Sequence, residues 1–145
     1  MVKILIKKIN KNVKVPIYET AGSSGMDLVA NNNKKIIINP NKISMVPTGI
    51  AVAIPKNYEI QIRPRSGLAA KKGISVLNTP GTVDSDYRGE IKIILINLSK
   101  KSFIVKSGDR VAQMVVCPVI KGKFKEVKIL PVTLRGKKGF GSTGK

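Results

Sequence analysis

Apolar and polar side chains alternate over much of this chain, in short β-branched runs. Residues 2–9 alternate with a period of about two, which is typical of a strand with one buried face. Turn-forming residues at 39–41, 55–57 and 106–109 separate several of the runs. The pattern predicts further strands over residues 36–38, 43–46, 50–54, 58–62, 74–77, 90–97, 103–105, 111–119 and 124–129.

Only one segment, residues 66–72, is a plausible helix, and it is short. Many short strands at this spacing predict an all-β sandwich or barrel with one short helix. The length of 145 residues fits one domain with a sizeable core. No apolar run is long enough to cross a bilayer, and the alternating start does not resemble a signal peptide, so we expect a soluble, unexported protein.

The charge is strongly positive, with 27 basic and 8 acidic residues and a formal net charge of +19. This balance favours a polyanionic partner, either nucleic acid or a phosphorylated small molecule. However, lysines are scattered as singles and pairs among many Asn and Ile residues, which indicates a compositional bias on a solvated surface. Arginine suits bidentate binding of phosphate or carboxylate, so each arginine of the chain is a candidate for that role. A structural ion pair is an equal alternative for each of these arginines. The five arginines are Arg63, Arg65, Arg88, Arg110 and Arg135.

Histidine is absent, which narrows the possible chemistry. Proton abstraction near neutral pH must fall to a carboxylate, a lysine or the single cysteine, and imidazole-based metal sites are excluded. Cys117 lies in an apolar run, where a small buried hydrophobe is the expected role, and it can form no internal disulfide. This usage suits a reducing cytoplasm.

Residues 78–91 concentrate polar chemistry between two apolar runs. Pro-Gly at one end and Arg-Gly at the other predict a β-hairpin with a polar, conformationally pinned tip. A solvated turn would explain the composition equally well. The stretch contains Asp84, Asp86, Tyr87, Arg88 and Glu90.

Four other segments carry residues that a sandwich does not need. Residues 21–28 place glycines before a carboxylate, and residues 110–113 pair an arginine with a glutamine. Arg65 and Ser66 lie at the expected start of the helix, where backbone N–H groups favour an anion. The tail at 135–145 is typical of a disordered end, but a mobile arm whose Phe140 stacks on a planar ring fits its composition as well.

Together and in this order, the five segments resemble the five motifs of the trimeric deoxyuridine triphosphatases (dUTPases). The matching stretches are AGSSGMDL, RPRSGLA, NTPGTVDSDYRGEI, RVAQ and RGKKGFGSTG. The resemblance implies a distorted jelly-roll-like β-barrel or sandwich over residues 1–130 and a flexible C-terminal arm over residues 131–145. It also implies a cytoplasmic homotrimer with active sites at subunit interfaces, without a membrane or a specific nucleic-acid partner.

The resemblance implies that water attacks the α-phosphorus of dUTP, giving dUMP and pyrophosphate, which keeps uracil out of DNA and supplies dUMP for thymidylate synthesis. Mg²⁺ is expected to be held mainly by the substrate phosphates, with no direct protein ligand. Asp84 matches the aspartate that activates the water, in agreement with the lack of histidine. Tyr87 matches the ring that excludes a 2′-hydroxyl, and Asn78 matches the amide that helps to recognise uracil.

The remaining matches concern the phosphates and the lid. Asp27 matches a supporting aspartate near the phosphate-binding arginine. For Arg88, Arg110 and Glu90 we expect structural or subunit-contact roles. The other implied substrate-binding residues are Arg65, Ser66, Gly67 and Gln113 from the core, and Arg135, Phe140, Gly141, Ser142 and Thr143 from the arm.

One departure from the motifs concerns Lys138, which stands where the family usually has glycine and so changes the lid. A dCTP deaminase is the nearest alternative within the fold, although the complete third and fifth motifs favour dUTP hydrolysis. A basic, non-catalytic nucleic-acid-binding module would explain the charge, but the chain lacks the aromatic-and-basic strand pattern of single-strand binders. An inactive homologue is disfavoured because every matched catalytic position is occupied.

Overall fold

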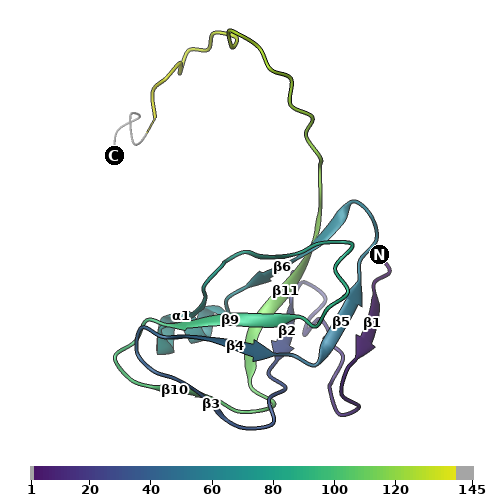
Figure 1. Cartoon of the computed structure of the whole chain (residues 1–145), viewed down its shortest axis with the longest axis vertical. Coiled ribbons are helices and arrows are strands. Elements are labelled where there is room, and N and C mark those ends of the chain that lie inside the picture. Colours follow the sequence, from purple (N-terminus) through teal and green to yellow (C-terminus); the bar gives the residue numbers. More distant parts are fainter. Residues whose placement is uncertain (1, 140–145) are drawn as a thin grey trace.

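The computed structural model describes residues 2–139 as an all-β body with one short helix (Figure 1). The largest sheet has four antiparallel strands in the order β2-β11-β6-β8. Its central strand, β11, pairs with β2 on one side and with β6 on the other. The strands are β2 (Met26–Val29), β6 (Tyr58–Arg63), β8 (Gly81–Val83) and β11 (Arg110–Pro118).

A second sheet and two strand pairs complete the body. The second sheet has the order β4-β9-β7, and β1 pairs with β5 and β3 with β10, all antiparallel. The strands are β4 (Ile43–Pro47), β7 (Ile74–Val76), β9 (Lys92–Asn97), β1 (Leu5–Lys8), β5 (Ile50–Ala53), β3 (Ile36–Ile38) and β10 (Phe103–Val105).

The core lies between these sheets and is built almost entirely from aliphatic side chains. Alternation along each strand places one face inside, as in β9, where Ile93 and Leu95 are fully buried while Lys92 is exposed. Asn97 is a buried polar exception. Its amide group donates to the carbonyls of Ile38 and Lys101, both at 2.8 Å, which satisfies the amide inside the core.

Most of the predicted elements are confirmed. The helix α1 (Ser66–Lys72) and the strands at 36–38 and 103–105 have the predicted bounds. Asn57 and Asn41 take positive φ values of 67° and 58° at the predicted turns, a conformation that asparagine tolerates better than most residues. None of the helices described in residues 2–139 is both long and apolar enough to cross a membrane.

The sequence pattern missed two strands. β2 and β8 each lie in a segment rich in glycine and polar residues, where no alternating run is long enough to be recognised. β8 also changes the expected hairpin. β7 and β9 do pair, but β8, in the connection between them, pairs with β6 in the other sheet. Residues 78–91 are therefore more than a simple turn.

The strand predicted at 124–129 is wrong. Beyond β11 the structure has no strand among residues 119–139, and Figure 1 shows this segment extending away from the body. A strand needs a hydrogen-bonded neighbour, and this segment lies away from the sheets of its own chain. Its apolar side chains are consequently exposed, with Phe124 100%, Ile129 84% and Leu130 78% accessible.

Candidate functional site

One pocket of about 470 Å³ brings together three predicted site residues of the segment 78–91. Asn78, Asp84 and Tyr87 line it, with apolar walls that include Ile91 and Val83. Asp84 directly follows β8, so the pairing of β8 with β6 sets where this carboxylate leaves the sheet. The pocket thus combines an amide, a carboxylate and an aromatic ring against an apolar wall, which suits a base and sugar beside a proton acceptor.

Two glycines shape this pocket. A Cβ at Gly81 would lie 3.2 Å from the Asn78 amide nitrogen and 3.3 Å from Ile62 Cβ, so glycine lets the amide fold against the strand. A Cβ at Gly89 would overlap the phenol of Tyr87. A side chain at residue 89 would therefore displace Tyr87, whereas one at residue 81 would require only a small shift of its neighbours.

Glu90 connects the pocket to the body. Its Oε1 accepts a hydrogen bond of 2.8 Å from the backbone N–H of Gly49, and its backbone carbonyl accepts one of 3.0 Å from the Tyr87 hydroxyl. Arg88 donates to the carbonyls of Ser85 and Tyr87 at 2.7 and 2.8 Å. These bonds hold the loop in shape, while the structural or subunit-contact roles expected of Arg88 and Glu90 stay predictions.

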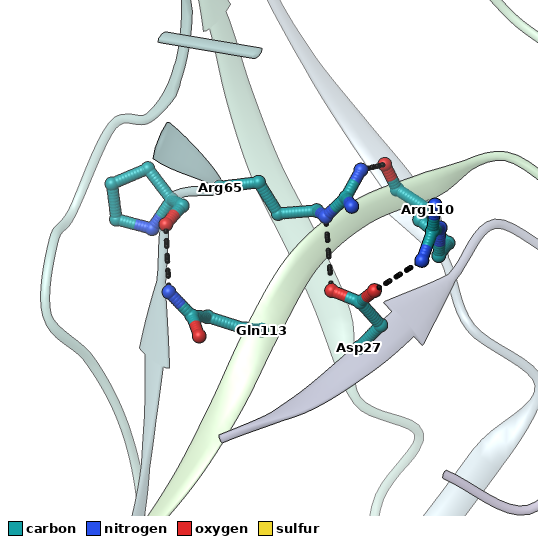
Figure 2. Close-up of polar contacts among 5 residues, drawn as sticks. Asp27, Arg65, Arg110 and Gln113 are labelled. Atoms are coloured by element: carbon teal, nitrogen blue, oxygen red, sulfur yellow. Dashed lines mark hydrogen bonds and ion pairs between the residues drawn. The ribbon is translucent and has the colours of Figure 1, made fainter. Parts of the chain in front are cut away.

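A second group of site residues gathers where β2, β6 and β11 meet (Figure 2). Arg65 Nε donates to Asp27 Oδ1 at 2.9 Å, and Arg110 Nη1 donates to Asp27 Oδ2 at 3.1 Å. Arg65 also donates to the backbone carbonyl of Arg110 at 3.2 Å. Both arginines therefore pair with one carboxylate, which is the ion-pair alternative left open by the sequence, while Arg110 remains half exposed.

Gln113 lies opposite Asp27 across the β11–β2 ladder. Its amide donates to the Pro64 carbonyl at 3.2 Å, directly before Arg65 (Figure 2). A Cβ at Gly25 would lie 2.8 Å from Gln113 Oε1, so this glycine allows the Gln113 side chain to approach its backbone closely. Gly25 of the first motif is thus needed for space.

Ser66 and Gly67 open the helix α1 and are exposed. No side chain caps this end of the helix in the described part of the chain, which leaves first-turn N–H groups available. Arg65 directly precedes them. The cations and N–H groups of this cluster suit phosphate oxygens.

The structure does not bring the two groups into one pocket. Arg65, Ser66 and Gln113 are absent from the lining of the pocket that holds Asp84. Arg135 is exposed on the extended C-terminal segment, where its Nε donates to the Lys138 carbonyl at 3.1 Å. The predicted residues Phe140, Gly141, Ser142 and Thr143 lie outside the described residues.

Cys117 differs from its expected role as a buried hydrophobe. It is partly exposed on β11, and its sulfur lies 3.9 Å from an Arg63 nitrogen. Alternation along β11 places Cys117 on the face opposite the core-packed side chains of Met114 and Val116. The hydrogen-bond contacts found for the Cys117 sulfur within residues 2–139 are with Arg63 and the Val115 carbonyl, and neither residue is a predicted site residue.

The carboxylates of residues 2–139 form no cluster of three that could hold a metal ion. Asp27 lies beside Arg65 and Arg110, and each of its carboxylate oxygens pairs with one of these arginines. Mg²⁺ commonly binds through substrate phosphates and waters with few protein ligands. The residues present fit a magnesium ion of that kind better than a cage made by protein side chains alone.

Comparison with known proteins identifies the family. The family model for dUTPase matches residues 11–144. The chain belongs to the dUTPase family. Relatives include the deoxyuridine 5'-triphosphate nucleotidohydrolase of Hydrogenobaculum sp. (strain Y04AAS1), 54% identical over 98% of each chain. That of Rickettsia typhi is 50% identical over 99% of this chain and 98% of its own.

Solved dUTPase structures share the fold. A variant of the dUTPase of phage 80alpha superposes with a TM-score of 0.87 at 23% identity, covering 97% of this chain and 98% of the other. The Staphylococcus bacteriophage 80alpha dUTPase with dUPNHPP gives 0.85 at 24% identity, covering 99% of each. Membership of the dUTPase family thus rests on sequence, and these structures support the fold.

Several positioning residues of this dUTPase were missed by sequence reasoning. Gly25, Gly81 and Gly89 each remove a Cβ that would press on a predicted site residue. The N–H of Gly49 holds the Glu90 carboxylate. Glycines inside the motifs were the available signal, but only the three-dimensional contacts show which side chain each one serves.

Proposed function

We propose that this protein hydrolyses dUTP to dUMP and pyrophosphate by attack of water at the α-phosphorus. The observation that carries the proposal is the pocket where Asn78, Asp84 and Tyr87 meet. Family membership and relatives named deoxyuridine 5'-triphosphate nucleotidohydrolase support it. Such an enzyme keeps uracil out of DNA and supplies dUMP for thymidylate synthesis.

Asp84 acts as the general base in this proposal. Its carboxylate is exposed at the pocket, where it can accept a proton from water as the oxygen attacks phosphorus. The chain has no histidine, and two carboxylates, Asp84 and Glu90, line the pocket. The Oε1 atom of Glu90 already accepts a hydrogen bond from the Gly49 N–H. Asp84 is therefore the freer of the two acids.

Asn78 and Tyr87 select the nucleotide. The Asn78 amide can donate to and accept from a uracil edge, and backbone groups of the same segment supplement it. The Tyr87 ring is fixed at its hydroxyl by the Glu90 carbonyl, so it presents a rigid face to the sugar. A rigid ring in contact with the sugar leaves no space for a 2′-hydroxyl.

Phosphate binding belongs to Arg65, Ser66, Gly67 and Gln113, with Asp27 orienting Arg65. Phosphoryl transfer depends on positioning and neutralisation of charge, which arginine and backbone N–H groups provide. Mg²⁺ held mainly by the substrate phosphates would neutralise further charge when bound. A mutant dUTPase of phage phi11, which shares the fold with a TM-score of 0.80 at 19% identity, coordinates a structural Mg(II) ion.

We further propose that the protein works as a cytoplasmic homotrimer of distorted jelly-roll subunits. Within a single chain the Asp84 pocket and the Arg65 group do not form one pocket. A shared site would unite the Asp84 pocket of one subunit with the Arg65 group of another. The exposed apolar side chains of the C-terminal segment support an assembly that covers them, among them Ile120, Phe124, Leu130, Val132 and Leu134. The arm from residue 131 onward, with Arg135, Phe140, Gly141, Ser142 and Thr143, would close over the substrate.

The deciding experiment measures pyrophosphate release from dUTP, dTTP, dCTP and UTP, with and without Mg²⁺. We expect rapid release from dUTP alone and a strong dependence on Mg²⁺. Comparable rates with all four nucleotides would refute the assignment. Ammonia release from dCTP would instead indicate a deaminase, the nearest alternative within the fold.

A mixing experiment tests the shared site. An Asp84→Asn subunit lacks the base, and an Arg65→Ala subunit lacks the phosphate grip. If each site combines both groups from different subunits, refolding the two inactive variants together should restore part of the activity. No recovery, with both variants shown to co-assemble, would mean that each subunit builds its own site.

A further inference from the structure

Four lysines surround a surface hollow at the C-terminal end of α1, and none of the predicted site residues lines it. Lys71 and Lys72 form the last turn of α1, and Lys100 and Lys101 lie in the turn after β9. All four are exposed and line one open hollow of about 770 Å³. The sequence shows only two separate lysine pairs, and the fold brings them together.

A rigid junction holds the two pairs side by side. The N–H of Leu98 donates to the Gly73 carbonyl at 2.8 Å, which ties the end of α1 to the turn. Gly73 has a φ of +65°, and a Cβ there would lie 3.1 Å from Ser99, so the two backbones approach closely. Asn97, fully buried, accepts from the N–H and the hydroxyl of Ser99 at 2.9 and 2.8 Å and donates to the carbonyl of Lys101. The backbone segments that carry the two lysine pairs are thus held side by side.

No carboxylate offsets this charge locally. The residues that line the hollow include neither aspartate nor glutamate, and the ion pairs found within residues 2–139 involve none of the four lysines. Lys71 and Lys72 are favourable at a helix C-terminus, but that effect does not account for Lys100 and Lys101. Four like charges around one hollow repel one another until an anion neutralises them.

The chemistry of the hollow favours a repeating phosphate backbone over a single small anion. Its cations are all lysines, which act as point charges on flexible stems and lack the bidentate fork of arginine. The one aromatic residue that lines it, Phe103, is half-buried and packs against the core, so no free ring offers a stacking platform for single-stranded bases. Phosphate contacts of this kind carry no sequence information.

We propose that this four-lysine hollow binds the phosphate backbone of double-stranded nucleic acid without sequence specificity. The lining of the hollow includes none of the predicted site residues, although Ser66 and Gly67 open the same helix, and the proposal does not depend on the proposed hydrolysis of dUTP. The net charge of +19 would add long-range attraction to the local contacts. The binding would hold the enzyme near the polymer whose uracil content its proposed reaction limits.

The test measures binding of the full chain to a mixed-sequence DNA duplex by fluorescence anisotropy from about 50 to 200 mM salt. The hollow variant carries Lys→Gln changes at Lys71, Lys72, Lys100 and Lys101, which retain much of each aliphatic stem. The control variant carries Lys→Gln changes at Lys7, Lys8, Lys34 and Lys35, which are exposed pairs elsewhere with the same total charge. Thermal midpoints and dUTP hydrolysis of both variants verify folding.

We expect the slope of log K against log salt to become shallower by about 3 to 4 in the hollow variant, close to 0.9 for each phosphate that is no longer neutralised. The control variant should change it by less than about 1. Equal slopes in the two variants would overturn the proposal, because net charge alone would then explain binding. Tighter binding of a single-stranded oligonucleotide, or no binding of the duplex by the unmodified protein, would overturn it as well.

If the fourfold hollow variant fails to fold, the pair Lys100→Gln and Lys101→Gln leaves α1 intact. This double variant should still reduce the slope by about 1.5 to 2. The matched double control is Lys34→Gln with Lys35→Gln. A slope unchanged by the Lys100 and Lys101 substitutions would refute a local site.

Discussion

Arg65 is held by Asp27 through a hydrogen bond of 2.9 Å between Nε and Oδ1. The pair connects the first and second motifs across the end of the four-stranded sheet, although the residues are far apart in the sequence. Arg110 occupies the other Asp27 oxygen at 3.1 Å. One carboxylate therefore orients two guanidinium groups, and the Arg65 group lies beside the exposed first turn of α1.

Replacing Asp27 by Asn should weaken this orientation. The free energy of unfolding should change by less than about 1 kcal/mol, because the pair is partly exposed and screened by solvent. We expect KM for dUTP to rise roughly tenfold with a smaller change in kcat, since Arg65 would be positioned less well for phosphate. Steady-state kinetics check this, with Glu59→Gln on the same sheet as the control. An unchanged KM would contradict the orienting role of Asp27.

The Asp84→Asn variant tests the general base. The amide is nearly isosteric but cannot take a proton from water, so kcat should fall by about 100-fold to 10,000-fold. The dissociation constant for a non-hydrolysable dUTP analogue should stay within a few fold. Asp86→Asn is the matched control, since Asp86 is exposed nearby and does not line the pocket. Normal turnover in Asp84→Asn would remove the assignment.

Tyr87 provides a test of sugar selection. The Tyr87→Ala variant should lose discrimination between dUTP and UTP by at least about tenfold, because the wall beside the sugar disappears. Tyr87→Phe keeps the ring and loses only the bond to the Glu90 carbonyl, a contribution of about 1 kcal/mol. Comparing kcat/KM for the two nucleotides separates these effects. If Tyr87→Ala discriminates as well as the unmodified protein, selection lies elsewhere.

Two glycines of the first motif offer a matched pair. In Gly25→Ala the new methyl group would lie 2.8 Å from Gln113 Oε1, so Gln113 must shift. Gly22 has no atom within 4 Å of the corresponding position. We expect Gly25→Ala to cost about 1–3 kcal/mol of unfolding free energy and to raise KM, while Gly22→Ala does neither. Denaturant unfolding and kinetics check both, and equal behaviour of the pair would contradict a spatial role for Gly25.

Deletion of residues 140–145 tests the lid. The strands of the described structure end at Pro118, so the thermal midpoint should change little. The rate of dUTP hydrolysis should fall severely, by at least about 100-fold, if the arm covers the substrate as proposed, because this cover would be removed. The Lys138→Gly variant, which keeps the full length of the arm, serves as the comparison for the truncated protein. An unchanged rate in the truncated protein would show that the arm is not the lid.

The sequence by itself determined the fold class, most strands and the helix α1. These follow from local alternation and turn chemistry, which residues such as Asn41 and Asn57 carry without reference to distant contacts. The motif residues were also found from the sequence, because their order and spacing resemble those of the dUTPases. Their assigned roles remain proposals.

Tertiary structure decided what local patterns cannot encode. β8 is a strand because β6 lies beside it, and residues 124–129 have the pattern of a strand but are not one, because the segment extends away from the sheets of its own chain. The same holds for the Gly25–Gln113 approach and for the meeting of Lys71 and Lys72 with Lys100 and Lys101. Strand pairing and close packing depend on residues far apart in the chain, so only the folded molecule specifies them.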